Sequence, residues 1–240
     1  MDRAERRGVG LQRVRHLLRR EPRSADLAVL HVGIVDSHDP GVPAARLRQT
    51  GMRGYDRHVP DRLHFTESDE ANALIAQDPM ALLIGFALDQ QVSVQKAFSG
   101  PLVLLERVGA LDAATVADAD LEPVFRERPA IHRYPGVMAK RVHDLAAYLR
   151  DAYDGDAARV WTDAADGAEL RANLEALPGF GEMKVKALGS VLAKRFGVAA
   201  AQDLVPWHPT LGDVDSADAL AEYQAAKRIH KKEWSKVATG

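Results

Sequence analysis

The sequence predicts an all-α protein. No stretch of any length alternates apolar and polar residues as a β-strand does, and no internal repeat is visible in the 240 residues. Apolar residues instead recur at three- and four-residue spacing, most clearly at Val185, Leu188, Leu192 and Phe196. A chain of this length can bury one or two substantial hydrophobic cores.

Capping residues predict where the first helices begin. Thr66–Asp69 offers an N-cap with acidic residues in the first turn, and Asp78 precedes Pro79, which is favoured at the first position of a helix. The body of that second helix, Met80–Leu88, is apolar almost all round, so we expect it to be the central buried helix. Ser93 can cap the next helix.

The rest of the chain is also predicted to be helical. Further helices are expected at residues 112–127, 138–150, 166–176, 182–196 and 216–237. Lys140 and Arg141 lie at the start of one of them, where they can either reach a phosphate or form a plain surface pair.

A tight turn, residues 177–181, separates two of these helices. Glycine at 179 and 181 permits backbone angles barred to other residues and lets another backbone approach closely. The N–H groups at the start of the following helix then form an anion site, with Lys184 and Lys186 beside it. This composition is typical of a hairpin that binds a DNA phosphate without reading sequence. The alternative is an ordinary helix–loop–helix with a glycine C-cap.

Two runs of residues carry a family resemblance. Leu177-Pro178-Gly179-Phe180-Gly181, followed by a basic helix, resembles the hairpin of the HhH-GPD superfamily of base-excision DNA glycosylases. Gln90-Gln91-Val92-Ser93-Val94 resembles a run in its 3-methyladenine DNA glycosylase II and endonuclease III branches. The two motifs occur in the family's order, and the resemblance covers roughly residues 64 to 200, most closely that of small actinobacterial members. It implies a two-lobed fold with a cleft between the hairpin and Gln90.

The resemblance also implies roles for the two glutamines. The residue that matches Gln90 lies at the protein–DNA interface in these enzymes and fills the space left by an everted base, with Gln91 beside it. Glutamine suits this role because it is long, uncharged, and both donates and accepts hydrogen bonds. The alternative is two glutamines in an exposed turn between helices.

The resemblance further implies a catalytic aspartate in a loop after the hairpin. Asp203, six residues after Gly197, is the candidate by spacing, although its neighbours depart from the family's Val-Asp-Thr-His pattern. Such a carboxylate orients water and stabilises a positively charged sugar. Asp89, Asp213 and Asp215 are the substitutes if Asp203 is only a turn residue, and the aspartate can also have been lost.

Strand cleavage is not expected. Lyase-capable members carry a hairpin lysine that attacks the sugar, and the matching position here is Met183, with Lys184 one residue later. A shift of one residue rotates a helical side chain by about 100°. The resemblance therefore implies a monofunctional glycosylase.

Composition limits the remaining possibilities. With no cysteine the chain forms no disulfide and no thiolate-bound zinc or iron–sulfur cluster, which separates it from the endonuclease III branch. The net charge is −2, but every lysine lies at or after Lys96, so a DNA-binding face is compatible with it. We expect a cytoplasmic, nucleoid-associated monomer that acts on double-stranded DNA with a damaged base, with no cofactor, no metal and no membrane partner.

The first 60 residues differ from the rest. They are rich in arginine and contain no lysine, so residues 1–60 are predicted to be a disordered or poorly packed extension of a helical domain at 61–240. Met52 is then a candidate start, and a basic arm that touches DNA or a packed helix at Leu11–Arg20 are the alternatives.

Three functions remain to be compared. The first is a DNA glycosylase that everts and removes a damaged base. The second is a DNA-binding module that keeps the hairpin and has lost the chemistry. The third is a helical interaction protein without a role in nucleic-acid binding, which requires both motif matches to be accidental.

Overall fold

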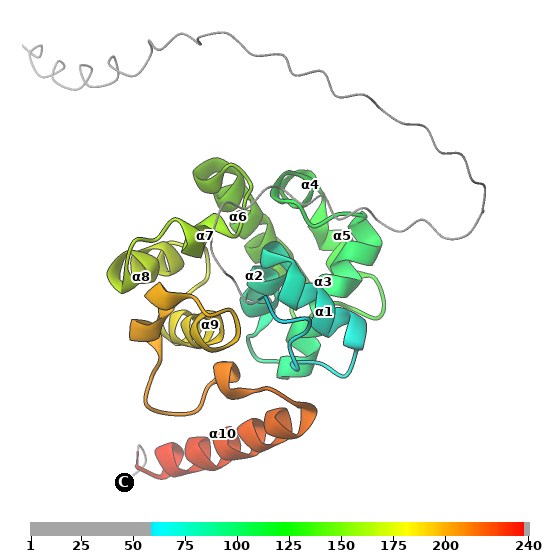
Figure 1. The fold of residues 1–240 in the computed structure, drawn as a ribbon. Coiled ribbons are helices and arrows are strands. Elements are labelled where there is room, and N and C mark those ends of the chain that lie inside the picture. The colour runs from blue at the N-terminus through cyan, green and yellow to red at the C-terminus, as the bar shows by residue number, and fades with distance from the viewer. Residues whose placement is uncertain (1–58, 238–240) are drawn as a thin grey trace, which may run out of the picture. The chain divides into compact units, whose positions relative to one another are not determined.

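A computed structural model describes residues 59–237, with side chains up to residue 228 (Figure 1). Every regular element in this range is a helix, and no strand occurs there, so the predicted all-α class is confirmed. The predictions for the N-terminal extension, including Met52 as a start and the helix at Leu11–Arg20, concern residues outside the described range.

The first three helices begin where their capping residues predict. They are α1 (Asp69–Gln77), α2 (Pro79–Leu88) and α3 (Val94–Val108). The Ser68 hydroxyl accepts from the N–H of Ala71 at 3.1 Å, and Asp78 Oδ1 accepts from the N–H of Met80 at 2.8 Å. Ser93 Oγ accepts from the third amide of α3 at 3.2 Å. Each cap satisfies a backbone donor that the helix itself cannot pair.

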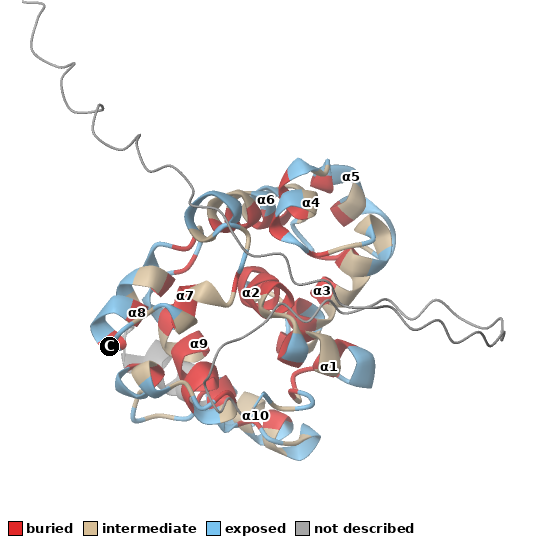
Figure 2. Ribbon diagram, turned by 45° about the horizontal axis from the view of Figure 1, so that its top comes forward, coloured by how far each residue is buried: buried red, intermediate tan, exposed pale blue. Residues whose placement is uncertain are grey.

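Helix α2 lies at the centre of the core. Its residues Met80–Leu88 are all buried, as the apolar sequence predicts, and α2 is buried along its length in Figure 2. Phe98 of α3 packs edge-on against Phe65 and Phe86, with ring centroids 4.9 and 5.1 Å away. Its ring occupies the space that a Cβ on Gly85 would need, with Phe98 Cε1 2.8 Å from that position. Glycine at 85 therefore lets α2 and α3 approach closely.

The prediction of one helix over residues 112–127 is wrong. Two short helices occupy this segment, α4 (Ala113–Asp118) and α5 (Leu121–Arg126), and the backbone between them is extended at Ala119, with ψ 144°. Pro123 explains the break. A proline inside a helix cannot donate to the residue four positions earlier, and its ring collides with that residue's carbonyl, which here belongs to Ala119.

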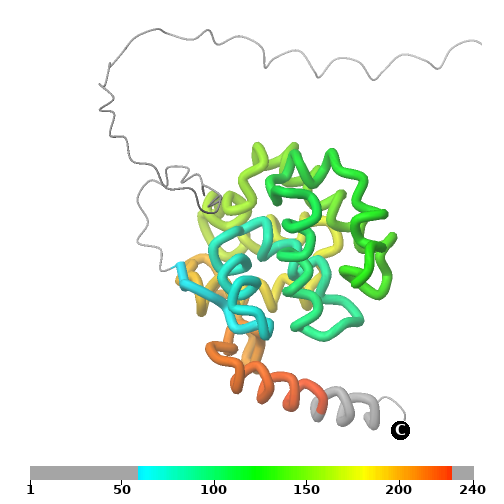
Figure 3. Tube along the Cα trace, turned by 90° about the vertical axis from the view of Figure 1, so that its right-hand side faces the viewer, coloured from blue at the N-terminus to red at the C-terminus, as the bar shows by residue number. Residues whose placement is uncertain are grey.

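The remaining elements are α6 (Pro135–Tyr153), α7 (Arg159–Thr162), α8 (Gly167–Glu175), α9 (Glu182–Arg195), the 3₁₀ turns η1 (Ala199–Leu204) and η2 (Leu211–Asp213), and α10 (Ala217–Val237). Helix α6 packs against α2, α4 and α5, whereas α9 packs against α8 and both 3₁₀ turns. Helix α10 runs along the lower edge in Figures 1 and 3. It touches the start of α3, where Gln224 Nε2 donates to Gln95 Oε1 at 2.8 Å.

The described residues hold neither a single membrane-spanning helix nor a cluster of metal-binding side chains. No single helix there is long and apolar enough to cross a membrane. Helices α1 and α2 reach the necessary length and hydropathy only when they are taken together, and the chain bends by 113° at their junction. The same residues contain no group of three or more histidine, aspartate or glutamate side chains placed to hold a metal ion.

Candidate nucleic-acid interface

The predicted tight turn joins α8 to α9 through residues 177–181. The N–H of Phe180 donates to the carbonyl of Leu177 at 3.0 Å, and Gly179 has φ +81°, a left-handed conformation that favours glycine. Gly181 is the N-cap of α9 and makes no side-chain cap. A Cβ on Gly181 would meet none of the described atoms within 4 Å, so the start of α9 is open to an anion.

Arg141, on α6, lies across this turn. A Cβ on Gly179 would be 2.8 Å from both Cδ and Nε of Arg141, so only glycine lets the arginine lie directly against the backbone. The Arg141 guanidinium donates to Gln90 Oε1 and thereby links the turn to the segment after α2. Its neighbour Lys140 instead forms a surface pair with Asp144 at 2.7 Å. Lys140 thus forms a surface pair, whereas phosphate binding by Arg141 stays a prediction.

Buried His132 fixes the backbone of Gln90. The Nδ1 atom of His132 accepts from the N–H of Tyr134 at 3.1 Å, so Nε2 carries the proton and donates to the Gln90 carbonyl, also at 3.1 Å. Burial lowers the pKa of His132 and keeps the ring neutral. The next residue, Gln91, has φ +57°, a conformation that costs a non-glycine residue about 1–2 kcal/mol. Long-range contacts therefore hold this turn in a strained conformation.

Lys184 points inward toward α2. Its Nζ donates to the carbonyl of Ala87 at 3.0 Å and lies 5.5 Å from the centre of the Phe180 ring. Burial, assisted by the charge of Arg141, lowers the pKa of Lys184 from 10.5 to about 8. The adjacent Met183 is 71% exposed. The one-residue shift along α9 thus places the amine, and not the thioether, in the cluster beside Gln90.

Asp89 is the carboxylate in this cluster. Burial raises its pKa, while the charges of Lys227 on α10 and Lys184 on α9 act in the opposite direction. No side-chain hydrogen bond involves the Asp89 carboxylate among the described residues, although its backbone N–H caps α2. A desolvated carboxylate under the influence of two ammonium groups is able to orient water or to stabilise a developing positive charge.

The other three candidate aspartates lie elsewhere. Asp203 packs beside the first residue of α8, where a Cβ on Gly167 would be 2.7 Å from Asp203 Oδ2. The nine residues of α8 extend about 13 Å from this point to the turn at its other end. Asp213 accepts from Lys194 Nζ at 2.6 Å and caps η2, and Asp215 is exposed after that turn. The structure therefore does not bring Asp203 together with Gln90 and the hairpin turn.

The lysines beside the turn are less available than the sequence suggests. Lys186 forms an ion pair with Glu182 at 2.6 Å, one turn back on α9. Lys184 is engaged with the carbonyl of Ala87. Of the predicted DNA-binding residues, Gln90, Gly179 and Lys184 are thus gathered in one cluster, and Gly181, Gln91 and Lys186 lie at its edge.

No protein-family model, curated protein or solved structure matches this chain. Its function must therefore be inferred from the cluster itself. The cluster combines Arg141, Lys184 and Lys227 as cations with Asp89 as the anion, around a glutamine that is anchored through its backbone. With three cationic side chains against one carboxylate, the cluster is able to bind an anionic ligand.

Two members of the cluster were not among the predicted site residues. The sequence predicts for Arg141 either a phosphate contact or a surface pair, and it predicts no role for His132. Their partners lie 51 and 42 residues away in the sequence, so no local pattern reports the contacts. The one indication is indirect, because a glycine such as Gly179 often marks a close approach of another group.

The amine of Lys184 is expected to titrate near pH 8, because burial disfavours its charged form. The native state then binds fewer protons than the unfolded chain between about pH 8 and 10.5, so the free energy of unfolding rises with pH across that window. The measurement is NMR of ¹³C-methylated lysines, assigned with Lys184→Gln. Arg141→Gln should raise this pKa and Asp89→Asn should lower it. Titration of Lys184 above pH 10 would contradict the burial of its amine.

Proposed function

We propose that this chain is a monofunctional DNA glycosylase with the two-lobed HhH-GPD fold, acting in base excision repair on double-stranded DNA. The observation that carries the proposal is the contact of Arg141 with both Gly179 and Gln90. The two sequence motifs that resemble this superfamily are 89 residues apart along the chain, counted from Gln90 to Gly179, yet one arginine touches both. Their proximity supports a shared site.

The proposed reaction begins with eversion of the damaged nucleotide. The open start of α9 binds a backbone phosphate through its amides. Gln90 then occupies the vacated stack, where its amide can both donate to and accept from the orphaned partner base. Its contact with Arg141 holds the glutamine side chain at the surface before DNA binds.

Hydrolysis replaces the bond from the sugar to the base with a bond from the sugar to water oxygen. The base leaves with the electron pair of the broken bond, and the proton that the attacking water loses ends on the released base. Within this proposal we assign the carboxylate that orients the water and stabilises the cationic sugar to Asp89, because it lies beside Gln90 and Lys184. Asp203 remains the candidate from spacing alone, and its distance from the turn argues against it.

The proposal includes no strand cleavage. Met183 occupies the position that carries an amine in lyase-capable members, and the amine of Lys184 donates to the carbonyl of Ala87. The second candidate function is a DNA-binding module without chemistry. The position of Asp203, beside the far end of α8, favours this alternative if Asp89 has no catalytic role.

The proposal is tested by single-turnover assays on duplexes that carry alkylated, deaminated or oxidised bases. Wild-type protein should release one class of base and leave the strand uncut. Gln90→Ala should slow release from duplex about tenfold or more and affect single strands less, because eversion from a stack costs a few kcal/mol. Duplex binding without release from any substrate would support the binding module, and absence of duplex binding would reject both functions.

A further inference from the structure

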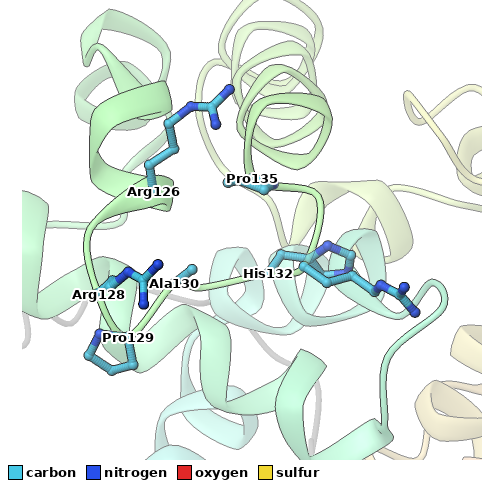
Figure 4. A pocket seen from close by; sticks show the side chains of 7 residues that line it. Arg126, Arg128, Pro129, Ala130, His132 and Pro135 are labelled. Carbon is cyan, nitrogen blue, oxygen red and sulfur yellow. The ribbon is translucent and has the colours of Figure 1, made fainter.

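A second positively charged surface lies beside the cluster, at the loop between α5 and α6. A depression of about 720 Å³ opens there, and three arginines line it, namely Arg126, Arg128 and Arg133 (Figure 4). His132 and Pro135 complete the side nearest to α6. Among the residues that the structure describes, no aspartate or glutamate lines the depression. Its chemistry is therefore that of an anion site.

Two of the three arginines form no ion pair with another described residue and are therefore available to an anionic ligand. Arg126 is paired with Glu122 at 2.6 Å, and the pair packs over Gly136, where a Cβ would be 3.3 Å from Glu122 Oε1. Arg128 and Arg133 are exposed and form no ion pair within the part of the chain that the structure describes. The guanidinium fork of arginine matches phosphate geometry.

Two side chains of α3 hold the loop that carries these arginines by donating to its backbone carbonyls. Arg107 Nη1 donates to the carbonyl of Val124 at 2.7 Å, and its Nη2 donates to that of Pro129 at 3.0 Å. Lys96 Nζ donates to the carbonyl of Ala130 at 2.7 Å. Backbone contacts of this kind fix the loop before a ligand arrives, which lowers the entropic cost of binding. Arg107 is itself paired with Glu127 at 3.7 Å, so Lys96 is the further positive charge that these contacts bring to the loop.

The depression is continuous with the proposed DNA surface. His132 lines it and also donates to the Gln90 carbonyl. Helix α6 leads from Pro135 at its edge to Arg141, six residues or about 9 Å along the axis. The two positions therefore lie close enough together to contact the backbone of one nucleic-acid strand.

Exposed apolar side chains lie between the two positions. Tyr134 is 40% and Val137 60% exposed, and Arg133 lies over the Tyr134 ring with its guanidinium carbon 4.9 Å from the ring centre. A free phosphate ion would leave these side chains in water. The sugars of a nucleic-acid strand would cover them, which favours a strand over an isolated anion.

We propose that this depression is a second phosphate site, in which Arg128 and Arg133 bind the backbone of the same duplex at a phosphate other than the one at the hairpin turn. This inference rests on the proposed function, because it takes the ligand of the neighbouring cluster to be DNA. It adds a second anchor that fixes the direction of the bound strand. Neither anchor contacts base edges, so both act without sequence preference.

The test compares wild type with Arg128→Gln/Arg133→Gln on an undamaged duplex. The double variant should bind about tenfold more weakly, and the slope of log Kd against log salt should fall by about one, because one phosphate contact is lost. Phosphate-ethylation interference should disappear at one position and remain at the strongest site. Arg150→Gln, at the far end of α6, is the matched control and should change none of these.

The outcomes separate this inference from the proposed function. An unchanged salt slope and an unchanged interference pattern in the double variant, with the thermal unfolding of wild type, would overturn the second site. Saturable binding of inorganic phosphate that the double variant loses, without any change in duplex binding, would also overturn it. A chain that binds no duplex would overturn it together with the glycosylase. A chain that shows the predicted slope but releases no base would reject only the enzymatic function.

Discussion

Asp89→Asn is expected to lower the single-turnover rate of base release by about 10²–10³-fold, the loss that follows removal of one electrostatic group at a reacting centre. The substitution keeps the size and shape of the side chain and removes its charge. Because the backbone N–H of Asp89, and not its carboxylate, caps α2, the fold should be preserved. The measurement is the rate of base release at saturating protein, on whichever damaged duplex is a substrate of the wild type.

Asp203→Asn is the companion variant for this experiment. The length of α8, about 13 Å, separates Asp203 from the hairpin turn. The Asp203→Asn variant should therefore release the base at a rate within a few-fold of wild type. The reverse result, with Asp203→Asn inactive and Asp89→Asn active, would return the carboxylate to the position that sequence spacing favours. Loss in neither variant would mean that the water is oriented by another group.

The pH dependence gives a second measure of the same assignment. Burial raises the pKa of Asp89, so its carboxylate becomes protonated at a higher pH than an ordinary aspartate does. Since the ionised form carries the proposed role, the rate should decline as pH falls through that raised pKa. Asp89→Asn should remove this acidic limb from the profile.

Local chemistry explains how far the fold could be predicted. Ser68, Asp78 and Ser93 cap the helices that the sequence predicted, because a cap depends only on the two or three residues that follow it. The break between α4 and α5 also has a local cause, because in a continuous helix the ring of Pro123 would collide with the carbonyl of Ala119. Residues 112–127 are also rich in alanine, which favours a helix on both sides of that proline.

The candidate site could be predicted only in part. Gly179 was predicted at a turn from its conformational freedom, and the structure agrees. Its second requirement, room for Arg141, is a contact between α6 and the turn that no pattern within either segment reports. Lys184 illustrates the same limit, because its partner Ala87 lies 97 residues away and the packing of α9 on α2 decides which side chain turns inward.

The largest effect on stability is expected at Phe98. Phe98→Ala should lower the free energy of unfolding by about 3–5 kcal/mol, the usual cost of emptying a phenylalanine site in a core. Phe98 is fully buried between Phe65 and Phe86, so little water or side chain can fill the cavity. Phe98→Leu, which keeps most of the volume, is the control and should cost less. Urea unfolding measures both.

The close approach of α2 and α3 makes a sharper version of this experiment. Gly85→Ala alone should destabilise by about 1–3 kcal/mol, because the new methyl group meets the Phe98 ring. In the Phe98→Ala background the same substitution should be neutral or stabilising, since the ring is gone and alanine favours a helix over glycine by about 1 kcal/mol. Additive effects would mean that the ring does not press on Gly85. Ala87 lies in the last turn of α2, and Asp89 and Gln90 follow the helix directly. The packing of α2 on α3 therefore also sets the position of the candidate site.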